Sequence, residues 1–309
     1  MAIELRALTR ADLPSVRDFL ARDCDLPDAA LVAEEKLFGA APGHLKTESF
    51  GAFSQHEPIG VAAASGKWLR MLAVRPNARG RGIGTSLLAM AESAIAATGA
   101  AAARTLDQPG NYLAPGIEAG DAETIAWFAR RGYREVGRNS NLLIDLADNR
   151  AVSPRALSDL TARAADAGYD TTRAGRERAA VIAGAIGAAF GRVWAFEVER
   201  ALAVDPPGVH VAVHRASGDV AAFAVHDGNN RGLGWFGPAG TFEGHRSCGL
   251  GAALLVACLL DVARTGKRTG IISWIGPREF YARTVGVAGE RHYVVLHKNL
   301  EPIIGEDPP

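Results

Sequence analysis

The sequence carries one short motif twice, and this repetition constrains the fold more than any other feature. The motif is an arginine followed by a glycine-rich loop and an apolar helical stretch, at Arg79–Gly84 (RGRGIG) and Arg246–Gly251 (RSCGLG). Both copies fit Arg-x-x-Gly-x-Gly and then reach a leucine pair and a Thr-Gly step, with every landmark shifted by the same offset. Since an ordinary domain has roughly 150 residues, the chain of 309 residues is predicted to be a duplicated domain.

The duplication places a domain boundary near residue 150. Asn141–Leu146 has the pattern of a short strand, and Ala147–Pro154 turns polar and ends in proline, as linkers do. We therefore expect one domain at 1–150 and a second at 151–309. Each half repeats one order: a helical region, antiparallel strands, the glycine loop with its helix, a strand, a short aromatic helix and a closing strand. This order predicts a mixed α/β fold in each half.

The strand pattern is clearest in the second half. Val209–His214 and Val220–His226 alternate with period two and are joined by a turn-forming segment, which predicts a hairpin. A third strand is expected after the glycine- and asparagine-rich turn Asp227–Gly232. The helix after each glycine loop carries its large apolar residues at helical spacing, so one stripe is expected to pack on a sheet.

Composition excludes several classes of function. Lysine plus arginine equals aspartate plus glutamate at 34 each, so no net charge attracts the chain to nucleic acid or an anionic membrane. The longest apolar run, Ala179–Phe190, is too short to span a bilayer. The three cysteines are odd in number and none form a C-x-x-C pair, which argues against disulfides and a zinc site; they are Cys24, Cys248 and Cys258. We expect a soluble cytoplasmic protein without nucleic-acid or membrane partners.

The glycine loops have the character of anion-binding sites. A strand that enters a glycine-rich turn and then a helix leaves backbone N–H groups unpaired at the positive end of the helix dipole. Glycines let a phosphate approach the backbone closely, and Arg79, Arg81 and Arg246 add charge. No phosphate-binding G-x-x-x-x-G-K-[ST] motif occurs, and the G-x-G-x-x-G at Gly232–Gly237 runs into a proline instead of a helix. The alternative is that the glycines serve only turns and helix packing.

The segment Leu72–Leu88 resembles motif A of the GNAT acetyltransferases, in which a strand, loop and helix hold the pyrophosphate of acetyl-CoA. The second copy, Gly237–Leu255, is similar but looser before its arginine. The resemblance implies two tandem GNAT domains and acetyl-CoA as the cofactor. It assigns to cofactor binding Leu72, Ala73, Val74, Arg79, Gly80, Arg81, Gly82, Ile83, Gly84 and Thr85 in the first half, and Arg246, Ser247, Cys248, Gly249, Leu250 and Gly251 in the second.

In GNAT enzymes an amine attacks the thioester directly, which requires an oxyanion donor and an acid for the leaving thiolate. The resemblance implies that a backbone N–H of Leu69–Val74 or Leu233–Ala239 is the donor. It also assigns the acid to Tyr281, because Glu279–Gly286 is similar to the family pattern F-Y-x-K-x-G-F. A phenol with its ordinary pKa suits a thiol leaving group, although Tyr281 could instead pack on the sheet.

The first half lacks this acid, because Phe128 or Trp127 stands at the equivalent position, depending on the alignment. We therefore predict that the first domain keeps the cofactor cradle without the acid, while the second domain carries Tyr281. Glu279 is a candidate base, but it could cap its helix, and a relay of waters is an equal alternative. His226, Asp227 and His245 are expected to be loop or surface residues, and no metal is assigned.

An insertion in the first half suggests where an acceptor binds, since Gly132 and Gly286 are separated by less than the offset of the two loops. The insertion includes the proline- and glycine-rich loop Asp107–Gly116, whose Asn111 and Tyr112 suit hydrogen bonding and stacking, although Tyr112 could equally be packed down. Asn111–Gly116 and Ser273–Tyr281 resemble bacterial tandem-GNAT proteins that include glucosamine and glucosaminide N-acetyltransferases. This resemblance implies an amino-sugar acceptor, with Tyr112, Trp235 and Trp274 available for stacking.

Other functions and assemblies remain open from the sequence. The acceptor could be a precursor like that of mycothiol synthase, or another small-molecule or peptide amine. Trp235 and Trp274 could be core residues of strands. A non-catalytic acyl-CoA-binding regulator is an alternative of another class. The two fused copies could form an internal pseudo-dimer, so either a monomer or a homodimer is expected.

Overall fold

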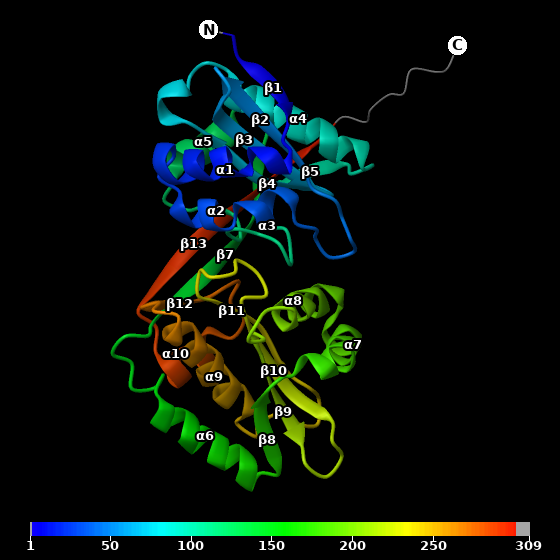
Figure 1. Ribbon diagram of the computed structural model, residues 1–309, viewed down its shortest axis with the longest axis vertical. Helices are drawn as coiled ribbons and strands as arrows, with labels where there is room; N and C mark the ends of the chain where they lie inside the picture. Colours follow the sequence, from blue (N-terminus) through cyan, green and yellow to red (C-terminus); the bar gives the residue numbers. More distant parts are fainter. Residues whose placement is uncertain (1, 301–309) are drawn as a thin grey trace, which may run out of the picture. The chain divides into compact units, whose positions relative to one another are not determined.

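The computed structural model describes residues 2–300 and contains two compact units. Unit 1 comprises the residues up to Asn139 together with those from His292 onward, and unit 2 comprises Ser140–Arg291. The ribbon in Figure 1 follows the chain from blue to red. Each unit is a twisted mixed sheet with helices on both faces, so the expected mixed α/β class is confirmed.

Unit 1 contains the strand order β1-β2-β3-β4-β5-β13, in which only the β4–β5 pair is parallel. A short strand, β6, pairs with β13. The elements are β1 (Glu4–Ala7), α1 (Leu13–Asp18), α2 (Pro27–Leu31), α3 (Ala33–Phe38), β2 (Glu48–Ser54), β3 (Glu57–Ser65), β4 (Trp68–Val74), α4 (Ile83–Ala97), β5 (Ala102–Thr105), β6 (Ile117–Glu118), α5 (Ala122–Ala129), the first part of β7 (Arg134–Asp145) and the last part of β13 (Gly289–Asn299).

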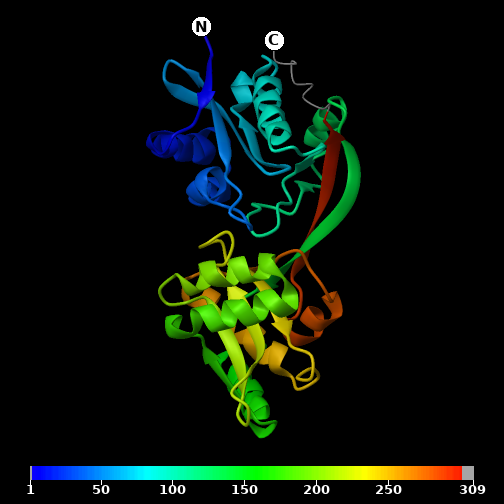
Figure 2. The same ribbon diagram turned by 90° about the vertical axis from the view of Figure 1, so that its right-hand side faces the viewer.

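Unit 2 repeats this plan with the order β7-β12-β11-β10-β9-β8, and its one parallel pair is β11–β12. Figure 2 shows α7 and α8 lying across one face of its sheet. The elements are the last part of β7, α6 (Pro154–Asp166), β8 (Tyr169–Arg173), α7 (Ala179–Phe190), α8 (Arg192–Leu202), β9 (Val209–His214), β10 (Val220–His226), β11 (Trp235–Thr241), α9 (Leu250–Arg264), β12 (Thr269–Ile272), α10 (Arg278–Val285) and the first part of β13. The three antiparallel strands predicted after residue 208 are β9, β10 and β11, which confirms the predicted hairpin.

The central strands are buried on both faces, because helices cover both sides of each sheet. Alternate side chains of a strand point to opposite sides and so join different cores. In β3, Ala62 and Ala64 join the core beneath α4, while Val61 and Ala63 join the core beneath α1–α3. In β10, Ala222 and Ala224 face α9, and Phe223 and Val225 face α7 and α8. The small residues on one face let the long helices α4 and α9 lie close to the sheet.

The closing strands of the two sequence repeats are exchanged. Residues 142–145 of β7 pair with β12, and residues 297–299 of β13 pair with β5. The strands β5 and β12 are equivalent elements, because their first residues, Ala102 and Thr269, are separated by the same offset as the two glycine loops. Each repeat therefore supplies the strand that completes the other repeat's sheet. Both strands can be followed in Figure 1 as the green and the red arrow.

This exchange explains why the units do not divide at the expected boundary near residue 150. The division falls at 139/140, inside β7, and the chain from residue 292 returns to unit 1. The polar segment Ala147–Pro154 is a turn within unit 2, where the Asn149 side chain donates to the Val285 carbonyl and Ser153 caps α6. Polarity located a loop correctly, but it carried no information on which sheet β7 joins.

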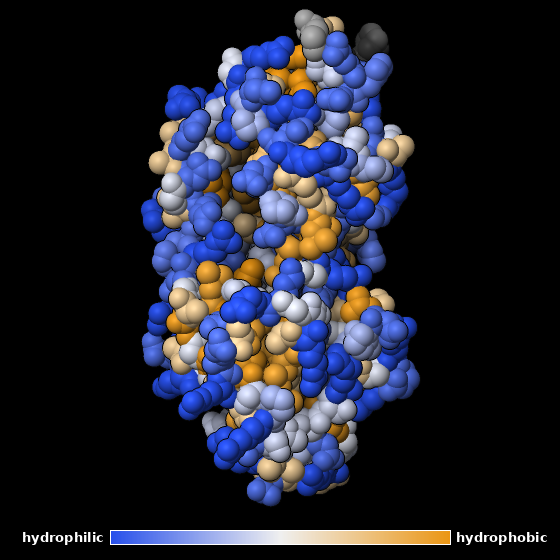
Figure 3. Space-filling model, turned by 60° about the vertical axis from the view of Figure 1, so that its left-hand side comes forward, coloured by the Kyte–Doolittle hydropathy of each residue, from blue (hydrophilic) through white to orange (hydrophobic). Residues whose placement is uncertain are grey.

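No helix within residues 2–300 combines the length and apolarity needed to cross a bilayer. On the face drawn in Figure 3, hydrophilic residues are spread over the surface and hydrophobic residues show between them.

Candidate active site

The two glycine loops have the same backbone conformation in both units. Gly82 and Gly249 are the residues before α4 and α9, and both are left-handed, with φ of +81° and +73°. Two residues earlier, Gly80 and Ser247 are also left-handed, with φ of +75° and +66°. Neither helix has a side-chain cap, so its first N–H groups are left to bind an anion. The loop conformation is therefore kept in unit 2 even though serine replaces glycine at residue 247.

The glycines of each loop serve two purposes. A Cβ atom built on Gly80, Gly82 or Gly249 meets nothing within 4 Å, so these residues supply a left-handed backbone beside open space. A Cβ on Gly84 would lie 3.3 Å from the Trp127 ring, and a Cβ on Gly251 would lie 3.4 Å from the Phe280 ring. The packing alternative therefore holds for the last glycine of each loop, Gly84 or Gly251, and not for those before the helix.

The strand before each loop separates from its parallel neighbour. β4 pairs with β5 only at Trp68 and Leu69, and β11 pairs with β12 only at Trp235 and Phe236. Beyond these residues each strand pairs on one side only, with β3 or β10, and each pairing contains a β-bulge at this point. The remaining edge of β4 and of β11 leads to the glycine loop with backbone groups that lack a strand partner. A backbone N–H on this edge is suitably placed to serve as the oxyanion donor predicted from the sequence.

Tyr281 lies on α10, and its hydroxyl makes no hydrogen bond to any residue that the structure describes. Its ring packs edge-on against Phe280 at 5.1 Å and lies 6.3 Å from the ring of Phe236 on β11. Burial raises the pKa of the phenol above its usual value, which keeps it protonated at neutral pH. An unpaired, protonated hydroxyl next to the separating strand is what an acid for a leaving thiolate requires.

Unit 1 has Phe128 in the place of Tyr281. Trp127 packs on Gly84 as Phe280 packs on Gly251, and Trp127 and Phe128 form the same edge-on pair, with centroids 4.9 Å apart. This contact resolves the ambiguity of the sequence alignment between Trp127 and Phe128. Phe128 is buried and has no proton to donate, so unit 1 lacks an acid at this position.

The candidate base Glu279 is on the solvent side of α10. Its side chain is 75% exposed, and its carboxylate lies 4.0 Å from the Arg278 guanidinium. Two residues along a helix correspond to a rotation of about 200°, so Glu279 and Tyr281 project from opposite sides of α10. The structure thus gives Glu279 no contact with the acid.

Three of the four predicted acceptor contacts are buried, which corrects the expectation of an exposed stacking surface there. Asn111 and Tyr112 lie inside unit 1, and Trp235 lies inside unit 2. The Asn111 amide donates to the Ala40 carbonyl at 2.9 Å, and its oxygen accepts from Lys36 Nζ at 3.0 Å. Trp274 is different, because its side chain is 38% exposed while its backbone N–H is held by Asn141 Oδ1 at 2.9 Å.

A buried polar network around Arg70 escaped the sequence analysis. Arg70 stands at the bulge of β4, and Gly237 holds the equivalent position on β11. Its Nε donates to Gln108 Oε1 at 2.8 Å, and its Nη1 donates to the Gly39 carbonyl at 2.7 Å and to Thr47 Oγ1 at 2.6 Å. A large side chain is therefore fixed at the bulge in unit 1, whereas unit 2 has none there.

Arg131 is a further cation at the first loop that the motif did not reveal. Its Nη2 donates to Thr85 Oγ1 at 2.7 Å in the first turn of α4, and its guanidinium lies over the Trp127 ring at 3.7 Å. Arg79 Nε donates to the Val74 carbonyl at 3.2 Å. The first loop thus has Arg79, Arg81 and Arg131 beside it, while Arg246 is the one arginine of the loop in unit 2.

Residues 32–135 match the family model of the acetyltransferase (GNAT) domain. Unit 1 therefore contains a GNAT acetyltransferase domain. The match covers α3, β2–β6, α4 and α5, so it includes the first glycine loop. No curated protein matches the chain.

Solved structures extend the GNAT fold to both units. The chain is similar to a tandem GNAT protein of the clavulanic acid biosynthesis pathway, with a TM-score of 0.67, 18% identity, and coverage of 97% of this chain and 99% of that one. A GCN5-related N-acetyltransferase from Sphaerobacter thermophilus gives a TM-score of 0.63 and 20% identity, covering 97% and 96% of the two chains.

A third similar structure is the glucosamine N-acetyltransferase region of a fungal multi-domain GH3 β-N-acetylglucosaminidase. It gives a TM-score of 0.73 and 18% identity over 96% of this chain, which spans only 38% of the fungal protein. The fold predicted from the two loops, a tandem pair of GNAT domains, is thus confirmed. The family match and these similar structures together support the prediction that the protein is an acyltransferase.

The structure also corrects the expectation for His226, which is buried at the end of β10 instead of exposed in a turn. Its Nδ1 lies 3.1 Å from Asp227 Oδ2. Burial by itself lowers the pKa of the imidazole, but the interactions with Asp227 and Asp261 outweigh burial, so the pKa of His226 is raised.

Proposed function

We propose that this protein is an N-acetyltransferase that transfers the acetyl group of acetyl-CoA to a primary amine by direct attack. The observation that carries the proposal is the repeated junction of three features: a strand that leaves its parallel neighbour, a left-handed glycine loop beside open space, and an uncapped helix N-terminus. This combination suits an extended ligand that ends in a pyrophosphate.

The residues of the first loop fit the anionic part of acetyl-CoA well. The N–H groups that begin α4, together with Arg79, Arg81 and Arg131, would hold the pyrophosphate, and the open space at Gly80 and Gly82 lets it approach the backbone. The second loop offers the same backbone with fewer arginines, and Ser247 adds a side chain where unit 1 has none.

The chemistry is assigned to unit 2. The amine nitrogen forms a bond to the acetyl carbon and the carbon–sulfur bond breaks, while a backbone N–H on the free edge of β11 stabilises the developing oxyanion. Tyr281 gives its proton to the departing sulfur, and the proton lost by the amine restores the phenol through solvent. Unit 1 cannot supply this proton, because Phe128 has no hydroxyl group. In addition, the Arg70 side chain occupies the bulge of β4.

For the acceptor we propose an amino sugar such as glucosamine. Two observations support this class: the fold similarity to a glucosamine N-acetyltransferase region, and the exposed indole of Trp274 directly after β12, which suits stacking on a sugar ring. A mycothiol-type precursor or another small amine fits the same chemistry and belongs in the same screen.

Phe128 favours a second role for half of the molecule, namely that unit 1 binds acyl-CoA without turning it over. In this case unit 1 is a regulatory or structural cofactor site, and unit 2 alone transfers the acetyl group.

The deciding experiment measures thiol release from acetyl-CoA with a panel of amines, amino sugars first. Tyr281→Phe is expected to lower kcat by about 10²- to 10⁴-fold, the usual contribution of a general acid, with little change in acetyl-CoA affinity. Tyr133→Phe is the matched control, because Tyr133 donates to Glu92 inside unit 1 and is not assigned to chemistry. Unchanged turnover in Tyr281→Phe refutes the assignment. If none of the tested amines releases thiol from acetyl-CoA, the result favours the non-catalytic alternative.

A further inference from the structure

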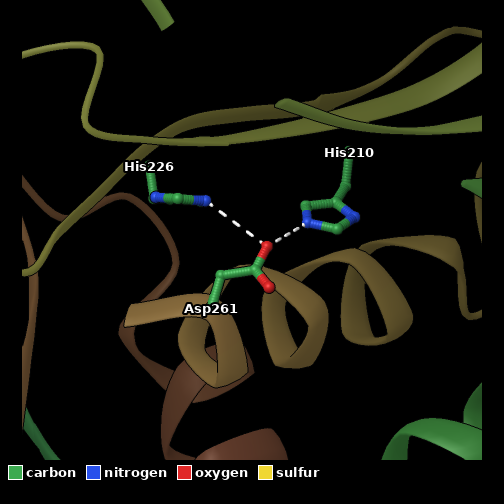
Figure 4. Close-up of side chains that lie close together, drawn as sticks. All are labelled: His210, His226 and Asp261. Atoms are coloured by element: carbon green, nitrogen blue, oxygen red, sulfur yellow. Dashed lines mark hydrogen bonds and ion pairs between the residues drawn. The ribbon is translucent and has the colours of Figure 1, made fainter. Parts of the chain in front are cut away.

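Three ionisable side chains converge between the sheet of unit 2 and α9. His210 comes from β9, His226 from β10 and Asp261 from α9, as Figure 4 shows. Asp261 Oδ2 lies 2.6 Å from His210 Nε2 and 3.4 Å from His226 Nε2. One nitrogen or oxygen atom of each residue lies within 4.8 Å of the corresponding atoms of the other two.

The hydrogen bonding of His226 leaves one nitrogen facing a carboxylate. Its Nδ1 lies 3.1 Å from Asp227 Oδ2, which accepts only, so Nδ1 carries a proton. Its Nε2 is buried without a hydrogen-bond partner among residues 2–300, in a side chain that is 7% exposed, and it points at Asp261 Oδ2. A lone pair on Nε2 would oppose this oxygen, so the contact becomes favourable only with a cation between the two atoms.

The duplicated unit shows that the fold itself does not need these groups. Ala94 corresponds to Asp261 at the offset of the repeat, Ala64 pairs with Leu69 as His226 pairs with Phe236, and Phe50 occupies the β2 position that corresponds to His210 on β9. Ala64 lies in the apolar core of unit 1, and the partly buried Phe50 and Ala94 pack against that core. Apolar residues at such a place are often as stabilising as buried charges, or more so. The polar set of unit 2 therefore calls for a role other than packing.

We propose that His210, His226 and Asp261 bind one transition-metal dication of the zinc class. Two imidazole nitrogens and one carboxylate oxygen are ligands that such ions prefer. With bonds of about 2.0–2.2 Å, two tetrahedral ligands stand roughly 3.4 Å apart, which matches the separation of His226 Nε2 and Asp261 Oδ2. His210 Nε2 has to move away from Asp261 by less than about 1 Å to reach the same spacing.

The residues around the three ligands fit this assignment. Asp227 holds the far nitrogen of His226, as a carboxylate commonly does for a histidine ligand. Asp261 and Asp227 bring two carboxylates to the site. Arg173 and Arg264 donate to Asp261 at 2.6 and 2.9 Å and fix its orientation, and their side chains, 29% and 66% exposed, keep their own charges partly in solvent.

The test is a titration of the chelator-treated full chain with Zn²⁺ and with Co²⁺, without acetyl-CoA. We expect one equivalent of Zn²⁺ per chain, a rise of several degrees in Tm, and a visible Co²⁺ spectrum typical of four-coordinate nitrogen and oxygen ligands. The matched variant His210→Phe/His226→Ala/Asp261→Ala places the residues of unit 1 in unit 2, so it is expected to fold and to lose all three signals.

A second variant, Cys248→Ser, removes the partly exposed thiol at the second loop and is expected to keep the equivalent of Zn²⁺. Absence of stoichiometric binding in the unmodified chain overturns the proposal, as does equal binding by the triple variant. In either case a proton, and not a metal ion, is the cation between His226 and Asp261. None of these readouts involves acetyl transfer. The metal proposal is therefore tested independently of the proposed function.

Discussion

Four glycine-to-glutamate variants separate cofactor binding from backbone strain. Gly82 directly precedes α4, and Gly99 lies just beyond its other end, with φ of +81° and +80°. Gly249 and Gly266 hold the same two positions around α9, with φ of +73° and +85°. A Cβ on any of the four meets nothing within 4 Å, so each pair is matched in strain and in space.

The expected loss of stability is similar within each pair. A side chain at a left-handed residue costs about 1–2 kcal/mol, and none of the four positions adds a steric clash. The free energy of unfolding in urea should therefore fall by about that amount in all four variants.

The expected loss of affinity differs sharply. A carboxylate about 4 Å from a phosphate, at an effective dielectric constant near 20, opposes binding by about 4 kcal/mol, or roughly 10³-fold. This repulsion is expected at Gly82 and Gly249, which precede the helix ends proposed to bind the pyrophosphate, and not at Gly99 and Gly266.

The assay is calorimetric titration of each variant with acetyl-CoA at one ionic strength. Loss of affinity in Gly82→Glu alone assigns the cofactor to unit 1, and loss in Gly249→Glu alone assigns it to unit 2. If Gly82→Glu and Gly249→Glu bind acetyl-CoA as well as Gly99→Glu and Gly266→Glu do, the loops are not cofactor cradles and the proposed function fails.

Three more predictions follow from the same contacts. Because burial raises the pKa of Tyr281, the alkaline fall of a kcat–pH profile should lie above the usual tyrosine pKa; a fall at the usual value that vanishes in Tyr281→Phe contradicts this. Asn111→Ala removes one acceptor of the buried Lys36 ammonium, which keeps its ion pair with Glu35, and should lower the free energy of unfolding by about 1.5–3 kcal/mol while turnover per folded molecule is unchanged; a raised acceptor KM would instead place Asn111 at the acceptor. Trp274→Ala should raise the acceptor KM about tenfold with the KM of acetyl-CoA unchanged, and an unaltered acceptor KM removes Trp274 from the site.

Local patterns were sufficient for the order of elements and for the loops. The positions of Gly82 and Gly249 before two apolar helices, and the alternation in β9 and β10, predicted a helix start and a hairpin that the structure contains. These features depend on neighbours within a few residues, where backbone preference and side-chain period act directly. The same reasoning predicted from the duplication that the halves share one fold.

Contacts between distant segments were beyond such patterns. The sequence does not reveal that β7 pairs with β12 and β13 with β5. Either strand would bury the same alternating side chains in its own repeat's sheet or in the other's. Asn111 and Tyr112 have the composition of an exposed loop, yet Asn111 satisfies carbonyls of residues far away in the chain, those of Glu35 and Ala40. His226 ends a strand at a turn, and only its pairing with β11 and the approach of α9 bury it beside Asp261.

The repeated Arg-x-x-Gly-x-Gly loop thus determined the fold and the backbone conformation before α4 and α9, because both depend on short-range backbone geometry. Packing decided the rest: Phe128 in the place of Tyr281, Arg70 at the bulge of unit 1, and the histidines beneath the sheet of unit 2. These differences arise where residues far apart in the chain meet, so two halves with one motif differ in what they can do.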